Sequence, residues 1–179
     1  MARPPEKLSP LQDLATPHTG EGKVELSERL CDSLVQVQAW PDSMDAVEMH
    51  LEGLKGDPTI MPTGPGRWLV EDAEEGLEDI LRSIIVADVG AVTGLTHARV
   101  VVSITGEKAE WVLASGIALD FDRSAFAVGS TQVSHHHEIG LTIHRTGEQS
   151  FDLYVFTSLA RSFWQWITRA ASEVGYRVL

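Results

Sequence analysis

The sequence predicts an α+β fold in which helices cover antiparallel sheets. Apolar and polar residues alternate in several short segments, which is the period of a half-buried strand. A strand runs directly into a segment with helical spacing in residues 67–84, and again in residues 152–169. This faint internal repeat predicts two interlocked strand–helix modules packed together. A chain of 179 residues is long enough for a single domain with a sizeable core.

The N-terminal segment is polar, and its four prolines follow no periodic pattern. Such a composition is typical of a flexible arm and not of a packed element. We therefore expect an extended arm over residues 1–30 that docks on a partner, followed by a single α+β domain over residues 31–179.

The first part of the domain contains the patterns of short strands and one helix. Alternating segments predict strands over residues 35–40 and 46–54. A Gly/Pro-rich loop follows, and a further strand is expected over residues 67–70. The loop sequence GPGRW (residues 64–68) lacks the Lys-Ser/Thr of a phosphate-binding loop, so it predicts a turn that enters the strand. Residues 74–85 predict a helix with acidic residues in its first turn, and one face carries Leu77, Ile80, Leu81 and Ile84.

The second part repeats this order of elements. A strand over residues 98–105 is followed at Gly106 by a short helix over residues 107–114. Consecutive antiparallel strands are then expected over residues 129–134, 139–145 and 151–156.

The final helix has the clearest pattern in the chain. Ser158 is the expected N-cap and Gly175 the expected stop. Helical spacing places Trp166 in the core and Trp164 on a flank, about 100° round the helix from Phe163, where it can meet a neighbour. The apolar positions of this helix are Leu159, Phe163, Trp166, Ile167, Ala170 and Val174.

The charge balance and the single cysteine exclude several classes of function. With 26 acidic and 14 basic residues, the net charge is -12, which argues against a nucleic-acid partner. The strongest apolar run, residues 84–89, is interrupted by Asp88 and is far shorter than a membrane span. The N-terminus lacks the pattern of a signal peptide, so we expect a cytoplasmic protein with no membrane partner. Cys31 is the only cysteine, which excludes an internal disulfide.

A run of histidines, His135, His136 and His137, is the first candidate for a metal site. In a strand, His135 and His137 share a face, but no carboxylate or cysteine stands at supporting spacing. His137 and Glu138 begin a His-Glu-x-x-His motif, yet Leu141 occupies the position of its second histidine. A solvated or interface-facing strand end is favoured over a metal site.

The remaining candidates each have a structural interpretation. Asp120, Asp122 and Arg123 can form an acid/base and anion clamp, but carboxylates beside Gly and Ser usually serve turns. Neither Ser115 nor Ser130 lies in a nucleophile elbow.

Asp88 and Cys31 are two further residues with ionisable side chains that need an interpretation. Asp88 interrupts an apolar run and therefore needs a partner, for which His97 and Arg99 are the candidates. Nothing in the sequence marks Cys31 as an activated thiol. No catalytic constellation is predicted.

The order of motifs in the second part nevertheless resembles a known family. A strand ends in Gly, an Ala follows three residues later, and after a short helix come Asp-(apolar) and Phe-x-x-Gly; the matching positions are Gly106, Ala109, Asp120–Phe121 and Phe126–Gly129. The C-terminal helix carries tryptophans and ends in Gly-Tyr. Residues 100–130 and 139–176, and more loosely residues 86–99, resemble the gamma subunit of heterotetrameric sarcosine oxidases. That family belongs to the folate-binding, glycine-cleavage T-protein-like group.

The resemblance implies that the chain works with alpha, beta and delta subunits. It also implies that FAD, FMN, NAD and tetrahydrofolate are bound by the large subunits, and zinc by the delta subunit. It implies no catalytic residue, cofactor-binding residue or metal ligand on this chain, and we assign none.

The expected function is that of a structural gamma subunit in a sarcosine oxidase-like flavoenzyme. Such a complex would oxidatively demethylate sarcosine or a related N-methyl amino acid and transfer the one-carbon unit to tetrahydrofolate. The alternative is a stand-alone tetrahydrofolate-binding aminomethyltransferase-like or repair protein. It would need a pterin pocket with an acidic floor, for which Asp88, Asp120 and Asp122 are the candidates. A metal-binding module built on the histidine run is a third possibility.

Overall fold

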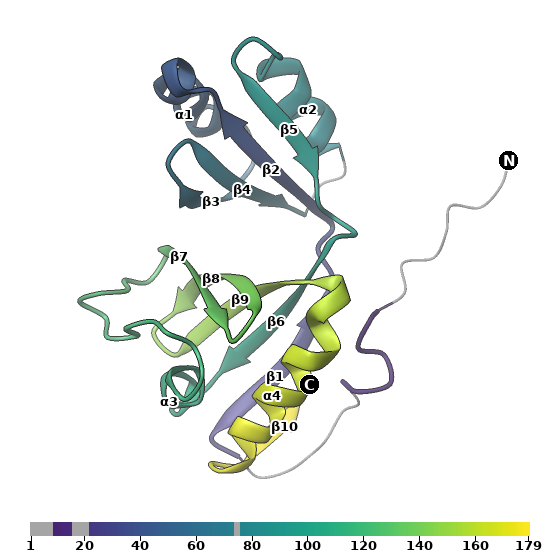
Figure 1. The fold of residues 1–179 in the computed structure, drawn as a ribbon, viewed down its shortest axis with the longest axis vertical. Helices are drawn as coiled ribbons and strands as arrows, with labels where there is room; N and C mark the ends of the chain where they lie inside the picture. Colours follow the sequence, from purple (N-terminus) through teal and green to yellow (C-terminus); the bar gives the residue numbers. More distant parts are fainter. Residues whose placement is uncertain (1–8, 16–21, 74–75) are drawn as a thin grey trace, which may run out of the picture.

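The computed structural model describes residues 9–15, 22–73 and 76–179, and these form two sheets, each covered by helices (Figure 1). The four-stranded sheet has the order β3-β4-β2-β5 and the six-stranded sheet the order β10-β1-β6-β9-β8-β7. All strand pairs are antiparallel except β1 with β10, which is parallel. The α+β class with antiparallel sheets is thereby confirmed.

The four-stranded sheet lies in the upper half of Figure 1 together with α1 and α2. Its core is the apolar layer between the sheet and these helices, which includes Val35, Val70 and Leu81. The elements are β2 (Ser33–Ala39), α1 (Met44–Glu52), β3 (Thr59–Gly64), β4 (Arg67–Asp72), α2 (Leu77–Ile84) and β5 (Gly90–Gly94).

The six-stranded sheet lies in the lower half and packs against α3 and α4. Its core contains alternate residues of each central strand, such as Val100, Val102 and Ile104, because only one face of the sheet meets the helices. The elements are β1 (Val24–Arg29), β6 (Arg99–Thr105), α3 (Ala109–Ala114), β7 (Thr131–His136), β8 (Ile139–Gly147), β9 (Ser150–Phe156), α4 (Ala160–Ser172) and β10 (Tyr176–Val178).

The predicted repeat corresponds to one strand–helix unit in each sheet: β4 with α2, and β9 with α4. The predicted strands over residues 35–40, 98–105 and 151–156 are also confirmed, within a residue or two at their ends. These segments alternate strictly, so local pattern and tertiary burial agree.

The predicted strand over residues 46–54 is wrong, because this segment forms α1. Val47, Met49 and Leu51 alternate in the sequence, which suits a strand. In the helix, Val47 and Leu51 are one turn apart and buried, whereas Met49 is 70% exposed. The spacing of four between Val47 and Leu51 fits a strand and a helix alike, and packing against the sheet selects the helix.

The predicted boundary at residue 30 also needs correction. Residues 24–29 form β1, which pairs with both β6 and β10 and lies inside the six-stranded sheet. Leu11 is buried in the same core. β1 is short, and only two of its residues, Val24 and Leu26, lie in the core. Two positions are too few to show the alternation by which a strand is predicted from sequence. Residues 1–8 and 16–21 lie outside the described residues, so docking of an arm on a partner stays a prediction.

The tryptophans of α4 exchange their predicted roles. Trp164 is buried with 2% of its surface exposed, together with Ala160, Phe163, Ile167 and Ala171. Trp166 is only partly buried at the margin of this core. The flank that the sequence assigned to a neighbour therefore lies in the core of the six-stranded sheet and its helices. Ser158 is not the N-cap, since it lies in a 3-10 turn over Thr157–Leu159 and makes no cap hydrogen bond to α4.

Candidate functional site

The two sheets meet through a small apolar cluster with a polar network beside it. The cluster takes Leu34, Met61 and Leu69 from the four-stranded sheet and Val101 and Tyr154 from the six-stranded sheet. Cys31, between β1 and β2, is buried in the same cluster. The cysteine that the sequence left unassigned is therefore a packing residue at the junction of the sheets.

The polar network is centred on Glu71 of β4 and Arg29 of β1. Arg29 forms an ion pair with Glu71 across the two sheets, and its Nη2 lies 2.9 Å from Oδ2 of Asp152. The hydroxyl of Tyr154 donates to Glu71 Oε2 at 2.6 Å, and Ser103 Oγ donates to Asp152 Oδ1 at 2.6 Å. Since Glu71 is buried, its contacts with Arg29 and Tyr154 stabilise the junction more than exposed contacts would.

Glu71 should make the stability of the chain depend on pH. Burial by itself raises the pKa of Glu71, but hydrogen bonds from Arg29 and Tyr154 and the charge of Arg29 together hold that pKa below its ordinary value. A carboxyl group with a lowered folded-state pKa adds stability above its unfolded pKa of about 4.3. That contribution is lost as the pH falls through the lower, folded pKa.

We expect the urea midpoint of the wild-type chain to fall as the pH is lowered from about 6 to about 3. Glu71→Gln should be less stable at neutral pH and should show a shallower fall. Glu148→Gln is the matched control, because Glu148 forms an exposed ion pair with Arg123. An equally shallow fall in the control would show that Glu71 does not carry the effect.

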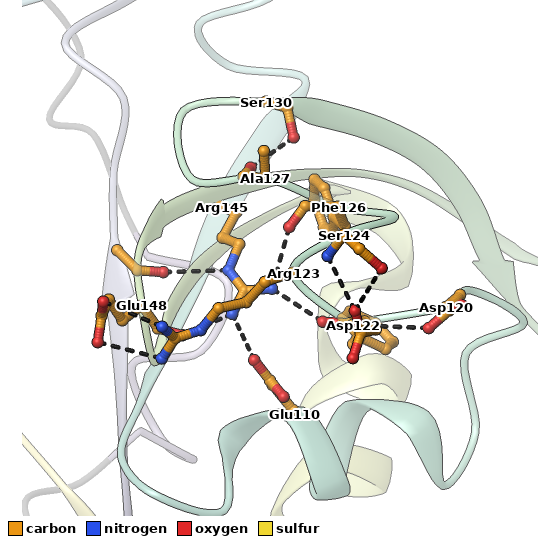
Figure 2. Close-up of polar contacts among 12 residues, drawn as sticks. Glu110, Asp120, Asp122, Arg123, Ser124, Phe126, Ala127, Ser130, Arg145 and Glu148 are labelled. Atoms are coloured by element: carbon orange, nitrogen blue, oxygen red, sulfur yellow. Dashed lines mark hydrogen bonds and ion pairs between the residues drawn. The ribbon is translucent and has the colours of Figure 1, made fainter.

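A second polar cluster surrounds Arg145 of β8, which is fully buried (Figure 2). Its Nη1 donates to the carbonyl oxygens of Phe121 and Phe126 at 2.8 and 3.0 Å. Its Nη2 donates to the carbonyl of Glu148 at 2.6 Å and pairs with Glu110 of α3. A buried arginine bound by carbonyls of the loop between α3 and β7 and of the turn after β8 fixes that loop to the sheet, so we assign Arg145 a structural role.

The residues considered for an acid/base and anion clamp form a turn, which is the interpretation that the sequence favoured. The backbone N–H of Asp122 donates to Asp120 Oδ1 at 2.9 Å, and Asp122 Oδ1 accepts from the N–H of Ser124 at 2.9 Å and from its hydroxyl at 2.6 Å (Figure 2). Arg123 turns away to pair with Glu148 at 3.0 Å. These carboxylates therefore stabilise the loop that Arg145 holds, as the structural interpretation expected.

The histidine run is divided between a strand end and a turn. His136 is buried, and its Nδ1 donates a hydrogen bond to the Gly116 carbonyl oxygen at 2.9 Å. Its ring stacks on that of Trp166, with 4.0 Å between the ring centroids. His137 lies in the turn after β7 with a φ of 48°. Within residues 9–15, 22–73 and 76–179, no group of three or more His, Cys, Asp or Glu is placed to hold a metal ion. The expectation of no metal on this chain stays a prediction.

The predicted ion pair of Asp88 is wrong. Asp88 is exposed and belongs to none of the ion pairs between described residues. Arg99 instead lies over the ring of Phe156, with its guanidinium carbon 3.5 Å from the ring centroid. Asp88 sits in the turn before β5, where solvent satisfies it.

An apolar groove lies between α1 and α2 on the four-stranded sheet. Its volume is about 460 Å³, and its walls include Met49, Leu54, Leu77, Ile80 and Ile84. Met49 is 70% exposed and Ile80, which the sequence placed on the buried face of its helix, is 53% exposed. Exposed apolar side chains around a groove are typical of a surface that contacts another protein. The sequence missed this surface because it assigned α1 to a strand.

Comparison with known proteins identifies the family of the chain. The sequence pattern of the sarcosine oxidase, gamma subunit family matches residues 54–173, which include both strand–helix units. The chain belongs to this family. No curated protein matches the sequence of this gamma-subunit family member.

Solved structures agree with the fold. The chain is similar to a chain of the heterotetrameric sarcosine oxidase from Corynebacterium sp. U-96, solved in complex with pyrrole 2-carboxylate: the TM-score is 0.81, the identity 24%, and the match covers 93% of this chain and 95% of that one. It is also similar to the glycine cleavage system aminomethyltransferase T from Bartonella henselae, with a TM-score of 0.60 and 16% identity. That match covers 82% of this chain and 45% of the other. The fold predicted from the T-protein-like resemblance is confirmed.

In the part of the chain that the structure describes, no helix is both long and apolar enough to cross a membrane. Asp88, Asp120 and Asp122, the candidate floors of a pterin pocket, are all exposed. None of them lines the groove between α1 and α2. These three carboxylates therefore do not form an acidic floor in this groove.

Proposed function

We propose that this gamma-subunit family member is a structural subunit of a heterotetrameric, sarcosine oxidase-like flavoenzyme in the cytoplasm. The complex would oxidatively demethylate sarcosine or a related N-methyl amino acid and pass the one-carbon unit to tetrahydrofolate. FAD, FMN, NAD and tetrahydrofolate would be bound by the alpha and beta subunits, and zinc by the delta subunit. This chain would contribute surface and no catalytic residue.

The observation that carries the proposal is the family match over residues 54–173. The similarity to a chain of a heterotetrameric enzyme, over nearly the whole length of both chains, supports it. The site geometry also supports it, because Glu71, Asp122, Arg145 and His136 are each engaged in contacts that hold the fold together.

Co-expression with the alpha, beta and delta subunits tests the proposal. We expect this chain to co-purify with them in a stoichiometric complex that oxidises sarcosine. Purified alone, it should bind no flavin and show no oxidation of sarcosine. An isolated chain that is yellow or active, or one that never joins the large subunits, would contradict the proposed role.

The groove between α1 and α2 is the surface that we expect to receive apolar side chains of a partner subunit. Ile80→Asp places a charge on this surface and should weaken assembly about tenfold or more, as expected for a buried interface anchor. Ile80 is 53% exposed in the isolated chain. The thermal midpoint of the isolated Ile80→Asp variant should therefore differ little from that of the wild-type chain.

Pull-down with the large subunits and melting of the isolated variant measure the two effects separately. Val128→Asp is the matched control, since Val128 is 51% exposed but lies outside the groove. Equal retention of Ile80→Asp and Val128→Asp in the pull-down would show that the groove is not part of the interface.

A further inference from the structure

A small cavity between the two sheets is lined by two arginines. Arg67 begins β4 in the four-stranded sheet, and Arg99 begins β6 in the six-stranded sheet. Both line a cavity of about 100 Å³, together with the polar residues Gln36, Thr63 and Thr142 and the apolar residues Leu69 and Val133. Cationic and neutral hydrogen-bonding groups from both sheets therefore converge on one space.

These arginines differ from most others in the chain. Among the described residues, Arg67, Arg99 and Arg169 form no ion pair, although acidic residues outnumber basic ones by 26 to 14. Two of these three share the cavity. The arginines with a carboxylate partner are Arg29, Arg82, Arg123, Arg145, Arg161 and Arg177.

The guanidinium groups at the cavity keep unused hydrogen-bond donors. Arg99 donates from Nη1 to the Tyr154 carbonyl at 3.3 Å, but its buried Nε has no partner among the described residues. Arg67 donates from Nε to the Gln38 side chain at 3.2 Å. Burial lowers the pKa of Arg99, whose guanidinium lies over the ring of Phe156 and pairs with no carboxylate among the described residues. A bound anion would supply both the charge and the missing acceptor.

We propose that Arg67 and Arg99 form a binding site for a carboxylate group between the two sheets. The planar fork of a guanidinium matches the two oxygens of a carboxylate. The small volume admits a carboxylate on a short chain, whereas cofactor-sized ligands need roughly 300–1,000 Å³. The carboxylate comes either from an acidic side chain of a partner subunit or from a free small acid. The first source rests on the proposed function, and the second does not.

Melting of the isolated full-length chain tests the site with acetate as the probe. We expect sodium acetate to raise the thermal midpoint by several degrees relative to sodium chloride at the same ionic strength. Arg99→Gln and Arg67→Gln should each lose most of this shift, and every variant is compared with itself in chloride, so changes in its own stability cancel. Arg123→Gln is the control, because Arg123 already has a carboxylate partner.

An absent acetate shift in the wild-type chain, or one that survives both substitutions, overturns the proposal whether or not the chain assembles. Pull-down with the large subunits then identifies the source. Weaker assembly of Arg67→Gln, together with competition by acetate, assigns the carboxylate to a partner subunit. Unchanged assembly with a lost acetate shift assigns it to a free small acid.

Discussion

Replacing Arg145 with Met is expected to lower the free energy of unfolding by about 3–5 kcal/mol, a large share of the stability of a single domain. Arg145 is fully buried and satisfies the carbonyl oxygens of Phe121, Phe126 and Glu148. Methionine fills a similar length but donates no hydrogen bond. Each buried carbonyl left without a donor costs about 1–3 kcal/mol, and partial entry of water limits the sum.

Urea unfolding of the isolated chain measures this loss. Arg145→Lys should recover little of it, because an ammonium group cannot reach several carbonyls with the fixed fork of a guanidinium. Arg123→Met is the matched control, because Arg123 lies on the same loop. Its ion pair with Glu148 is exposed, so the expected change is within about 1 kcal/mol. An Arg145→Met chain as stable as this control would show that the loop is held by other contacts.

Truncating the centre of α4 should have a comparable effect. Phe163→Ala is expected to cost about 3–5 kcal/mol, since Phe163 is fully buried and its removal leaves a cavity. Trp164→Ala should cost about as much, because Trp164 is buried on the same face of the helix. Trp166 is only partly buried, so Trp166→Ala should cost less.

The same urea experiment separates these three variants. Trp111→Ala is the control, because Trp111 is an exposed tryptophan on α3. Its loss of stability should be small. If Trp164→Ala lowers the free energy of unfolding no more than Trp111→Ala does, Trp164 is not a core residue. It would then lie on the flank of the helix, as the sequence pattern predicted.

The error over Trp164 has a simple physical origin. Phe163 and Ile167 fix the centre of the apolar stripe of α4, and both Trp164 and Trp166 lie close to its edge. The pattern of one helix does not say how the sheet beneath it is tilted. Trp164 lies within the core of the six-stranded sheet and its helices, whereas Trp166 lies at the margin of this core and stacks on His136 from the end of β7.

The candidate site shows the same limit more strongly. Glu71 and Arg29 are far apart in the sequence, as are Arg67 and Arg99, and each pair meets only because the two sheets pack face to face. No spacing rule within a strand predicts such a meeting. The interpretation of Asp120 and Asp122 as turn residues succeeded because their partners, including Ser124, are two residues away.

The sequence by itself determined the α+β class, the strands with strict alternation, the two strand–helix units and the family resemblance, because these are written in local periodicity and motif order. Only the tertiary structure decided that residues 44–52 are a helix, that residues 24–29 lie inside a sheet, and that two arginines share a cavity. Those features depend on which apolar surfaces pack against each other and on how the two sheets stack. They are therefore set by long-range packing, and no single segment of the sequence predicts them.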